Sequence, residues 1–102
     1  MALHKLSTQE ATEQLKVLPL WAFDESSSEI TRQFVFADFA QAFSFMSQIA
    51  ILAEEHNHHP EWRNVYNKVS ITWTTHDVQG LSRKDIELAR LCDQAFESRL
   101  AR

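Results

Sequence analysis

The longest regular pattern of apolar positions runs from residue 39 to residue 55 and has the period of a helix. Asp38 stands where an N-cap belongs. At about 100° per residue, the apolar side chains cover about half of the circumference, more than one sheet face requires. Two interpretations stay open: a deeply seated helix, or a helix that buries a second face against another copy of the chain. The residues of this arc are Ala42, Phe43, Phe45, Met46, Ile49, Ala50, Leu52 and Ala53.

Alternating apolar and polar residues predict a pair of strands on each side of this helix. Residues 20–23 and 29–36 should form a hairpin across the polar segment 24–28. Residues 61–75 should form a second hairpin with a two-residue turn at Tyr66 and Asn67, where Asn67 tolerates the left-handed backbone that such turns need. This register places Trp62 opposite Ile71, so that apolar and polar side chains separate onto different faces.

Capping signals predict the two remaining helices. Ser7 with Glu10 forms a capping box, so a short helix should run from residue 8 to about residue 16, before Pro19. Ser82 with Asp85 is a similar signal, and a helical period follows it to the C-terminus. The order is therefore α-β-β-α-β-β-α. It predicts an α+β fold, a four-stranded antiparallel sheet with helices packed on one face.

Composition narrows the class of protein. A length of 102 residues predicts one domain, residues 1–102, and a net charge of -4 argues against a nucleic-acid groove. The single cysteine, Cys92, allows no internal disulfide and suggests a reducing compartment. No signal core or membrane-length apolar run is present, so we expect a soluble, cytoplasmic protein that does not associate with membranes. Because the chain has a single glycine, Gly80, it cannot form a glycine-rich phosphate-binding loop.

The candidate chemistry lies in a histidine-rich tract that joins the long helix to the second hairpin. His58 and His59 precede Pro60, and imidazole is the side chain whose pKa of about 6.5 allows proton transfer near neutrality. Neighbouring residues of extended chain point in opposite directions, so solvated loop histidines are the plain alternative. Antiparallel pairing in the second hairpin should bring His76 near residues 58–60. His56 and His4 are assigned no function.

Two further residue types bear on this tract. Asp85 should cap the last helix, and its carboxylate could equally orient an imidazole on the loop that precedes that helix. A tryptophan such as Trp62 is more often a core residue than a residue that stacks on a ligand.

A metal site is the alternative to proton transfer for these histidines, but the tract lacks the paired spacing and the cysteine ligands of familiar zinc sites. We therefore expect no metal.

These residues together resemble the signature of the pterin-4a-carbinolamine dehydratases. The similarity also covers the segments 36–46, 64–69, 75–77 and 80–82, and it extends from about residue 6 to residue 96. Trp73 stands where a smaller aliphatic residue is common in that family, a departure that we expect to affect packing only. The signature positions filled here are Glu54, His58, His59, Pro60, Tyr66, His76 and Asp85.

The resemblance implies an enzyme that removes water from a 4a-hydroxytetrahydropterin to give the quinonoid dihydropterin, and so recycles the pterin cofactor of aromatic amino-acid hydroxylases. By resemblance, His58 and His76 would act as acid and base, in an order left open, and His59 would contact the substrate. Asp85 would orient a histidine or bind the pterin. Pro60 would shape the loop and Trp62 would line the pocket. No cofactor is implied.

The resemblance also implies a homodimer or homotetramer formed through the helix of residues 38–55, which fits its wide apolar arc. Animal relatives double as dimerisation cofactors of a homeodomain transcription factor. The alternative function is therefore an interaction protein with a secondary dehydratase site. The presence of the full set His58, His59, His76 and Asp85 argues against a vestigial site.

Overall fold

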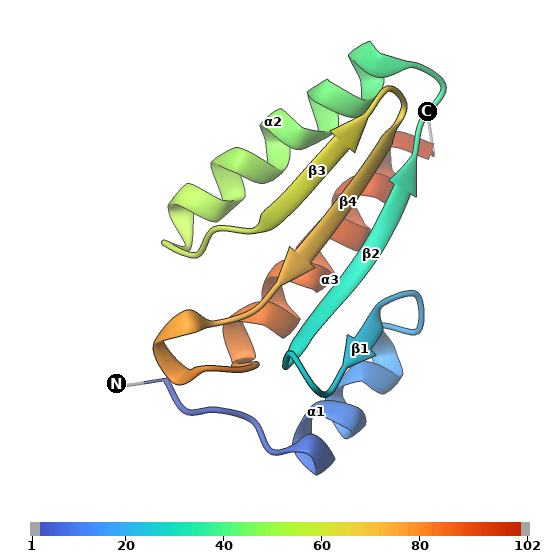
Figure 1. The fold of residues 1–102 in the computed structure, drawn as a ribbon. Coiled ribbons are helices and arrows are strands. Elements are labelled where there is room, and N and C mark those ends of the chain that lie inside the picture. The colour runs from blue at the N-terminus through green and yellow to red at the C-terminus, as the bar shows by residue number, and fades with distance from the viewer. Residues whose placement is uncertain (1–2, 101–102) are drawn as a thin grey trace.

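The computed structural model describes residues 3–100, in which helices pack against an antiparallel sheet (Figure 1). The order of helices and strands is the predicted α-β-β-α-β-β-α, with two short 3₁₀ turns added. The elements are α1 (Thr8–Gln14), η1 (Leu15–Val17), β1 (Ala22–Asp24), β2 (Glu29–Val35), α2 (Phe39–Glu55), β3 (Glu61–Val65), β4 (Lys68–Trp73), η2 (His76–Val78) and α3 (Arg83–Leu100).

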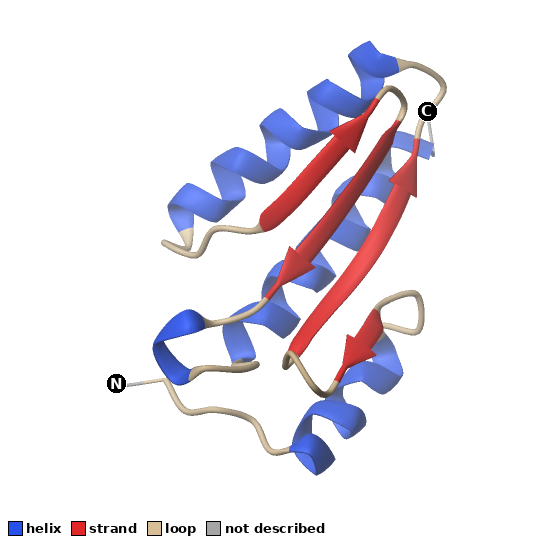
Figure 2. Cartoon of the chain, in the orientation of Figure 1, coloured by secondary structure: helices blue, strands red, loops and turns tan. Residues whose placement is uncertain are grey.

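The four strands pair in the order β1-β2-β4-β3, and every neighbouring pair is antiparallel. Helices α2 and α3 lie behind the same face of this sheet in Figure 2. The predicted α+β fold with helices on one face is thus confirmed. The core forms where that face meets the two long helices, and burial of each large apolar side chain there contributes about 1.5–3 kcal/mol. Its most fully buried large residues are Trp73, Phe34, Phe45, Ile30, Ile49, Ile71 and Leu88.

The second hairpin has the predicted register, with Trp62 paired to Ile71. The two-residue turn lies at Tyr66 and Asn67 as predicted, but Tyr66 and not Asn67 has the left-handed backbone (φ 51°). Asn67 instead donates its side-chain amide to the carbonyl of Phe36 at 2.8 Å, and its own carbonyl accepts from the Phe36 amide at 2.9 Å. Asn67 therefore anchors the turn to the segment before α2, which accounts for a polar residue at this position.

The first strand lies later than predicted. Leu20 is 64% exposed and precedes the strand, which spans Ala22–Asp24. Trp21 is buried, and its indole nitrogen donates to Oδ1 of Asp93 on α3 at 2.9 Å. The large residue that suggested strand alternation thus packs against the last helix, and only the residues after it pair with β2.

Helix α2 begins at the predicted residue, with the Asp38 side chain accepting from the Gln41 amide at 2.8 Å. Only part of its apolar arc is buried within the chain. Phe43 is 56% exposed, which contradicts a helix seated in the core across its whole arc. The buried residues are Ala42, Phe45, Ile49 and Ala53.

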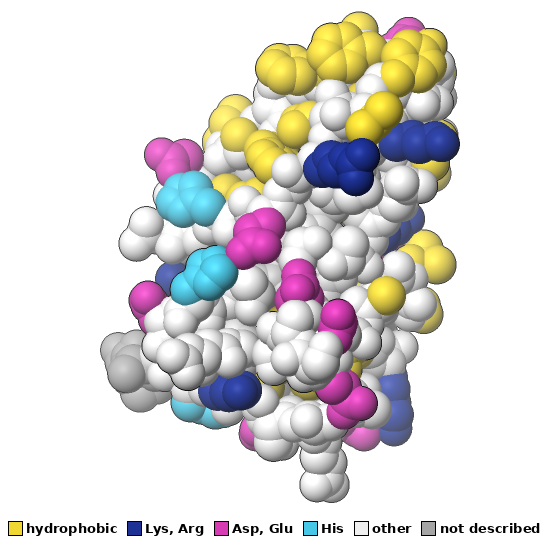
Figure 3. Space-filling model, viewed as in Figure 1, with side chains coloured by type: hydrophobic (Ala, Val, Ile, Leu, Met, Phe, Trp, Pro, Cys, Tyr) yellow, Lys and Arg dark blue, Asp and Glu magenta, His cyan; other side chains and the backbone are white. Residues whose placement is uncertain are grey.

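The open face of the sheet is divided into two zones (Figure 3). Histidine and acidic side chains gather beside one end of the sheet, whereas apolar side chains cover the opposite end (Figure 3). Within residues 3–100, no helix is long and apolar enough to cross a membrane.

Candidate functional site

The C-terminal end of α2 directs His58 into the protein. Asn57 has a left-handed backbone (φ 49°), and its amide donates to the Glu54 carbonyl at 3.2 Å. The His58 amide then donates to the Ala53 carbonyl at 3.0 Å. This paired arrangement is a Schellman motif, which ends a helix and reverses the chain sharply, with Asn as an accepted substitute for Gly. Asn57 therefore sets the direction in which the imidazole that follows enters the core.

His58 meets Asp85 in the interior. Its Nε2 lies 2.6 Å from Oδ1 of Asp85, and the side chains are 10% and 0% exposed. The predicted alternative role of Asp85, contact with an imidazole, is confirmed, but its partner is His58 and not a histidine on the loop directly before α3. Asp85 is also the third helical residue of α3, and its Oδ2 accepts the Ser82 amide at 2.9 Å. The two roles predicted for Asp85 coexist.

Two hydroxyl groups complete the surroundings of this carboxylate. Thr75 Oγ1 donates to Oδ2 of Asp85 at 2.6 Å and also lies 2.7 Å from Oγ of Ser82. Thr75 and Ser82 are both buried, at 3% and 0% exposure. A buried polar group costs free energy unless it is paired, so this closed set of contacts stabilises an otherwise expensive buried carboxylate.

Trp73 forms one wall of the histidine site. Its indole stacks on the imidazole of His58, with ring centroids 5.7 Å apart and planes 15° from parallel. The indole is fully buried, and its Nε1 has no hydrogen-bond partner within residues 3–100. Trp73 was expected to affect packing only; it also contacts a predicted catalytic side chain directly.

The other two predicted histidines lie at the surface, each beside a carboxylate. His76 Nε2 is 2.9 Å from Oε2 of Glu61, with the side chains 79% and 56% exposed. Glu61 follows Pro60, so the hairpin does bring His76 close to the predicted segment. His59 pairs with Glu54 in the same way, also in solvent.

His76 and Glu61 help to line a surface hollow of about 440 Å³. Its other lining residues are Ser27, Glu29, Thr74, Gln79 and Gly80. His58 does not line this hollow, and its imidazole contacts Asp85 on α3 instead. No hydrogen bond joins His58, His59 and His76 to one another within the described part of the chain. Pro60 and Trp62 are both half-buried, at the start of β3.

Sequence reasoning missed the residues that hold the histidines. Thr75 and Glu61 had no assigned role, Ser82 was predicted only as part of a helix cap, and Glu54 was noted only as part of a signature. The two glutamates carry a weak signal, since carboxylates near histidines are common partners for imidazole. The two hydroxyl residues carry almost none, because their contacts depend on the packing of β4 against α3.

The remaining titratable side chains near the site have structural explanations. His56 bonds through Nδ1 to the Leu52 carbonyl at 2.9 Å, and its own carbonyl accepts from Lys84 at 3.1 Å. Burial raises the pKa of the Cys92 thiol to about 12, so it stays protonated at neutral pH. Among the described residues, no group of three or more histidine, cysteine or acidic side chains is arranged to hold a metal ion.

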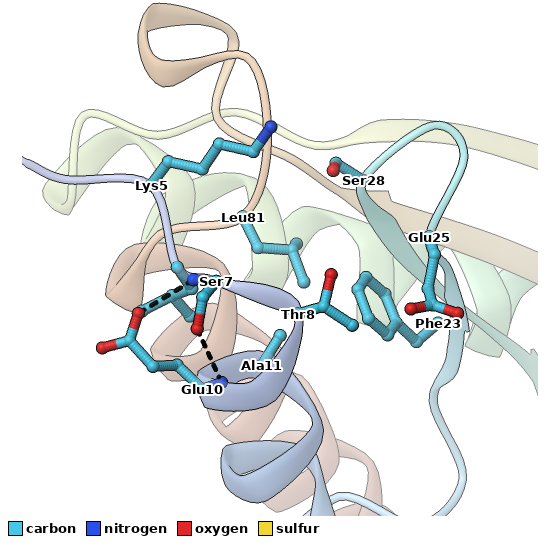
Figure 4. Close-up of a pocket in the computed structure, with 10 residues that line it drawn as sticks. Lys5, Ser7, Thr8, Glu10, Ala11, Phe23, Glu25, Ser28 and Leu81 are labelled. Atoms are coloured by element: carbon cyan, nitrogen blue, oxygen red, sulfur yellow. Dashed lines mark hydrogen bonds between the residues drawn. The ribbon is translucent and has the colours of Figure 1, made fainter.

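A second hollow, of about 410 Å³, lies between the start of α1 and strand β1 (Figure 4). The capping box of α1 borders it: Ser7 Oγ accepts the Glu10 amide at 3.0 Å, and Oε1 of Glu10 accepts the Ser7 amide at 2.8 Å. These contacts confirm the predicted start of α1, and the backbone bond lowers the pKa of Glu10. The lining contains no histidine, so the candidate chemistry does not lie here.

Comparison with known proteins gives a consistent result. The family model described as "Pterin 4 alpha carbinolamine dehydratase" matches residues 4–95. A Burkholderia lata protein, provisionally named a pterin-4-alpha-carbinolamine dehydratase, is 52% identical over 93 residues, covering 91% of each chain. A Rhizorhabdus wittichii protein with the same provisional name is 43% identical, covering 95% of this chain and 100% of its own.

A solved structure from Brucella melitensis, described as a transcriptional coactivator/pterin dehydratase, superposes with a TM-score of 0.88. It is 41% identical to this chain and covers 91% of it, and 99% of the Brucella chain is matched.

Proposed function

Because this chain belongs to the pterin 4 alpha carbinolamine dehydratase family, we propose that it removes water from a 4a-hydroxytetrahydropterin to give the quinonoid dihydropterin. The observation that carries this proposal is the set of three imidazole–carboxylate pairs at one end of the sheet. The reaction would support recycling of a pterin cofactor in the cytoplasm.

The chemistry requires two proton transfers. The C4a–O bond breaks, and the hydroxyl leaves as water only if an acid protonates it. The N5–H bond breaks as a base accepts that proton, and its electron pair forms the C4a–N5 double bond. Histidines in opposite protonation states can supply both steps, and each transfer is worth about 10²–10⁴ in rate.

We assign these two proton transfers to His58 and His76. His58 has a buried carboxylate beside it, and His76 has an exposed one. His59 would contact the substrate from the surface, with Glu54 beside it. Pro60 and Trp62, half-buried at the start of β3, would shape and line the substrate pocket. Asp85 would act through His58, because it is fully buried and cannot itself reach a pterin.

A direct assay tests the proposal. Purified protein without added metal should accelerate the dehydration of a synthetic 4a-carbinolamine pterin over the buffer rate. Absence of acceleration would contradict the dehydratase function. Activity that is abolished by a chelator and restored by a divalent metal would instead support a metal-dependent site.

We further propose that the outer face of α2 mediates self-association into a dimer or tetramer. Phe39, Phe43 and Ile51 on this helix are 50%, 56% and 62% exposed, an unusual apolar content for a free helix face. Sedimentation of the wild type and of Phe43→Ser should show a larger species for the wild type alone. Equal masses would contradict this interface.

A second candidate function is that of an interaction cofactor for a transcription factor. Two observations favour it: the Brucella relative is described as a coactivator as well as a dehydratase, and α2 has an exposed apolar face. A pull-down that returns a transcription factor, combined with no dehydratase activity, would favour this function over the enzyme.

A further inference from the structure

We propose that Thr75 is a positioning residue of the histidine site, which acts through a chain of hydrogen bonds that converge on Asp85, the partner of His58. This role adds to the proposed dehydratase function. Its expected effects on turnover rest on that function, whereas its expected effects on His58 do not. It concerns the four buried side chains Thr75, Ser82, Asp85 and His58.

The direction of the chain follows from counting hydrogens. An ionised carboxylate has only acceptor atoms, so the Thr75 hydroxyl must give its single hydrogen to Oδ2 of Asp85, 2.6 Å away. Thr75 then has no hydrogen left for Ser82 Oγ at 2.7 Å, so Ser82 donates to Thr75. Ser82 Oγ in turn accepts from the Lys84 backbone amide at 3.3 Å. Each link thus donates to the next one toward Asp85.

The same argument fixes the tautomer of His58. Oδ1 of Asp85 lies 2.6 Å from Nε2 of His58, so Nε2 carries the hydrogen in this contact. A neutral His58 therefore keeps its lone pair on Nδ1. This atom has no hydrogen-bond partner in residues 3–100. The buried side-chain atoms of these residues that lack a partner are Trp73 Nε1 and Arg99 Nε, so Nδ1 of His58 is not fully buried. Nδ1 is therefore the ring atom that solvent or substrate can reach.

Thr75 also links the two predicted proton-transfer histidines. Its amide donates to the Gly80 carbonyl at 2.8 Å, and its carbonyl accepts from Val78 at 3.2 Å. These backbone bonds close the short loop that begins with His76, the residue next to Thr75. The side chain of Thr75 holds the partner of His58, while its backbone anchors His76.

The informative variant is Thr75→Val, which keeps the β-branched shape and removes the hydroxyl. Without that donor, the Asp85 carboxylate loses one of its three contacts and holds His58 less firmly. We expect kcat for the dehydration to fall about tenfold, with KM changing less than about threefold, because the loss affects proton transfer more than substrate binding. Thr75→Ser retains the hydroxyl and should recover most of the turnover.

A second measurement does not depend on activity. In ¹⁵N-resolved NMR spectra, the Nε2 hydrogen of His58 should exchange slowly in the wild type and in Thr75→Ser, because it is buried and bonded. It should broaden or vanish in Thr75→Val. The ring protons of His58 should also lose part of the shift that the stacked Trp73 produces. Thr31→Val is the matched control, since Thr31 bonds only to the Thr72 hydroxyl at 2.7 Å and contacts no histidine.

The outcomes separate the two proposals. A wild type without dehydratase activity would end the proposed function, and the NMR comparison alone would then decide the role of Thr75. An active wild type with unchanged turnover or unchanged His58 signals in Thr75→Val would overturn the positioning role. If Thr75→Val does not fold, Ser82→Ala removes the preceding link. It should shift the same readouts in the same direction, and unchanged readouts there would also overturn the inference.

Discussion

His58 with Asp85 and His76 with Glu61 are the same pair of functional groups in opposite surroundings. The first pair is 10% and 0% exposed and belongs to a closed set of hydrogen bonds. The second is 79% and 56% exposed, and within residues 3–100 neither of its side chains has a further hydrogen bond. A buried pair is costly to break because it leaves an unpaired polar group, whereas an exposed one is worth little. The comparison suggests one imidazole with a fixed orientation and one that is free to adjust to substrate.

The largest effect is expected for Asp85→Asn. The amide keeps the shape of the carboxylate but brings a donor group against the Thr75 hydroxyl or the Ser82 amide, and it removes the charge beside His58. Turnover should fall by about 10²–10⁴, the range for loss of proton transfer by His58, the side chain that Asp85 holds in place. The free energy of unfolding should fall by about 1–3 kcal/mol. Steady-state kinetics and urea unfolding measure the two quantities, and near-normal values of both would remove the contrast between the pairs.

The next effect is expected for His76→Ala. Turnover should fall at least about tenfold, because a proton-transfer group is lost. The free energy of unfolding should change by less than about 0.5 kcal/mol, because the side chain is exposed. Turnover close to that of the wild type, with the same assay and the same folded state by circular dichroism, would exclude His76 from proton transfer.

A smaller effect is expected for Glu61→Gln. This change removes the charge beside His76 and leaves the side-chain shape, and an exposed ion pair contributes about 0–1 kcal/mol. Unfolding should therefore change little, and raising the salt concentration should reduce the difference in turnover between variant and wild type. Glu13→Gln, which removes the exposed pair with Lys16 on the first helix, is the matched control for a generic loss of surface charge. If Glu61→Gln lost as much turnover as Asp85→Asn, the exposed and the buried histidine–carboxylate pairs would not differ in importance.

The smallest effect concerns the buried thiol of Cys92. Its pKa is raised to about 12, so almost no thiolate exists in the folded protein at pH 8. In the unfolded chain the thiol titrates near 8.5, so folding stability should decrease as pH rises from about 8.5 toward 12. Alkylation by iodoacetamide should be slow until denaturant is added. Rapid alkylation under native conditions would show that the core beneath β4 opens readily.

The fold was predictable because its signals are local. Ser7 with Glu10 and Asp38 mark helix starts, and the pairing of Trp62 with Ile71 follows from alternation along the strands. The start of β1 was misplaced because Trp21, which resembles a strand residue, packs against α3 instead. The turn at Tyr66 and Asn67 was placed correctly, but its left-handed residue was misassigned because a contact of Asn67 with the segment before α2 outweighs the usual residue preference.

The site was predictable only in part. Its titratable residues stand out because histidines with a proline are uncommon together and match a family signature. The contact between His58 and Asp85 joins residues 27 apart, so it depends on how β4 packs against α3. The role of Thr75, and the contact of Ser82 with it, could not be recognised in advance, because buried and exposed hydroxyl residues look identical in a sequence.

The stacking of Trp73 on His58 gives the protein an internal optical reporter. Among the aromatic pairs of residues 3–100, this is the one that includes an imidazole. A ring stacked on an indole changes the surroundings on which the emission of that indole depends. The fluorescence of this chain should therefore change when His58 is replaced by Ala, with no label attached. Replacement of Trp73 by Phe would remove that signal and leave the emission of Trp21 and Trp62 as the background.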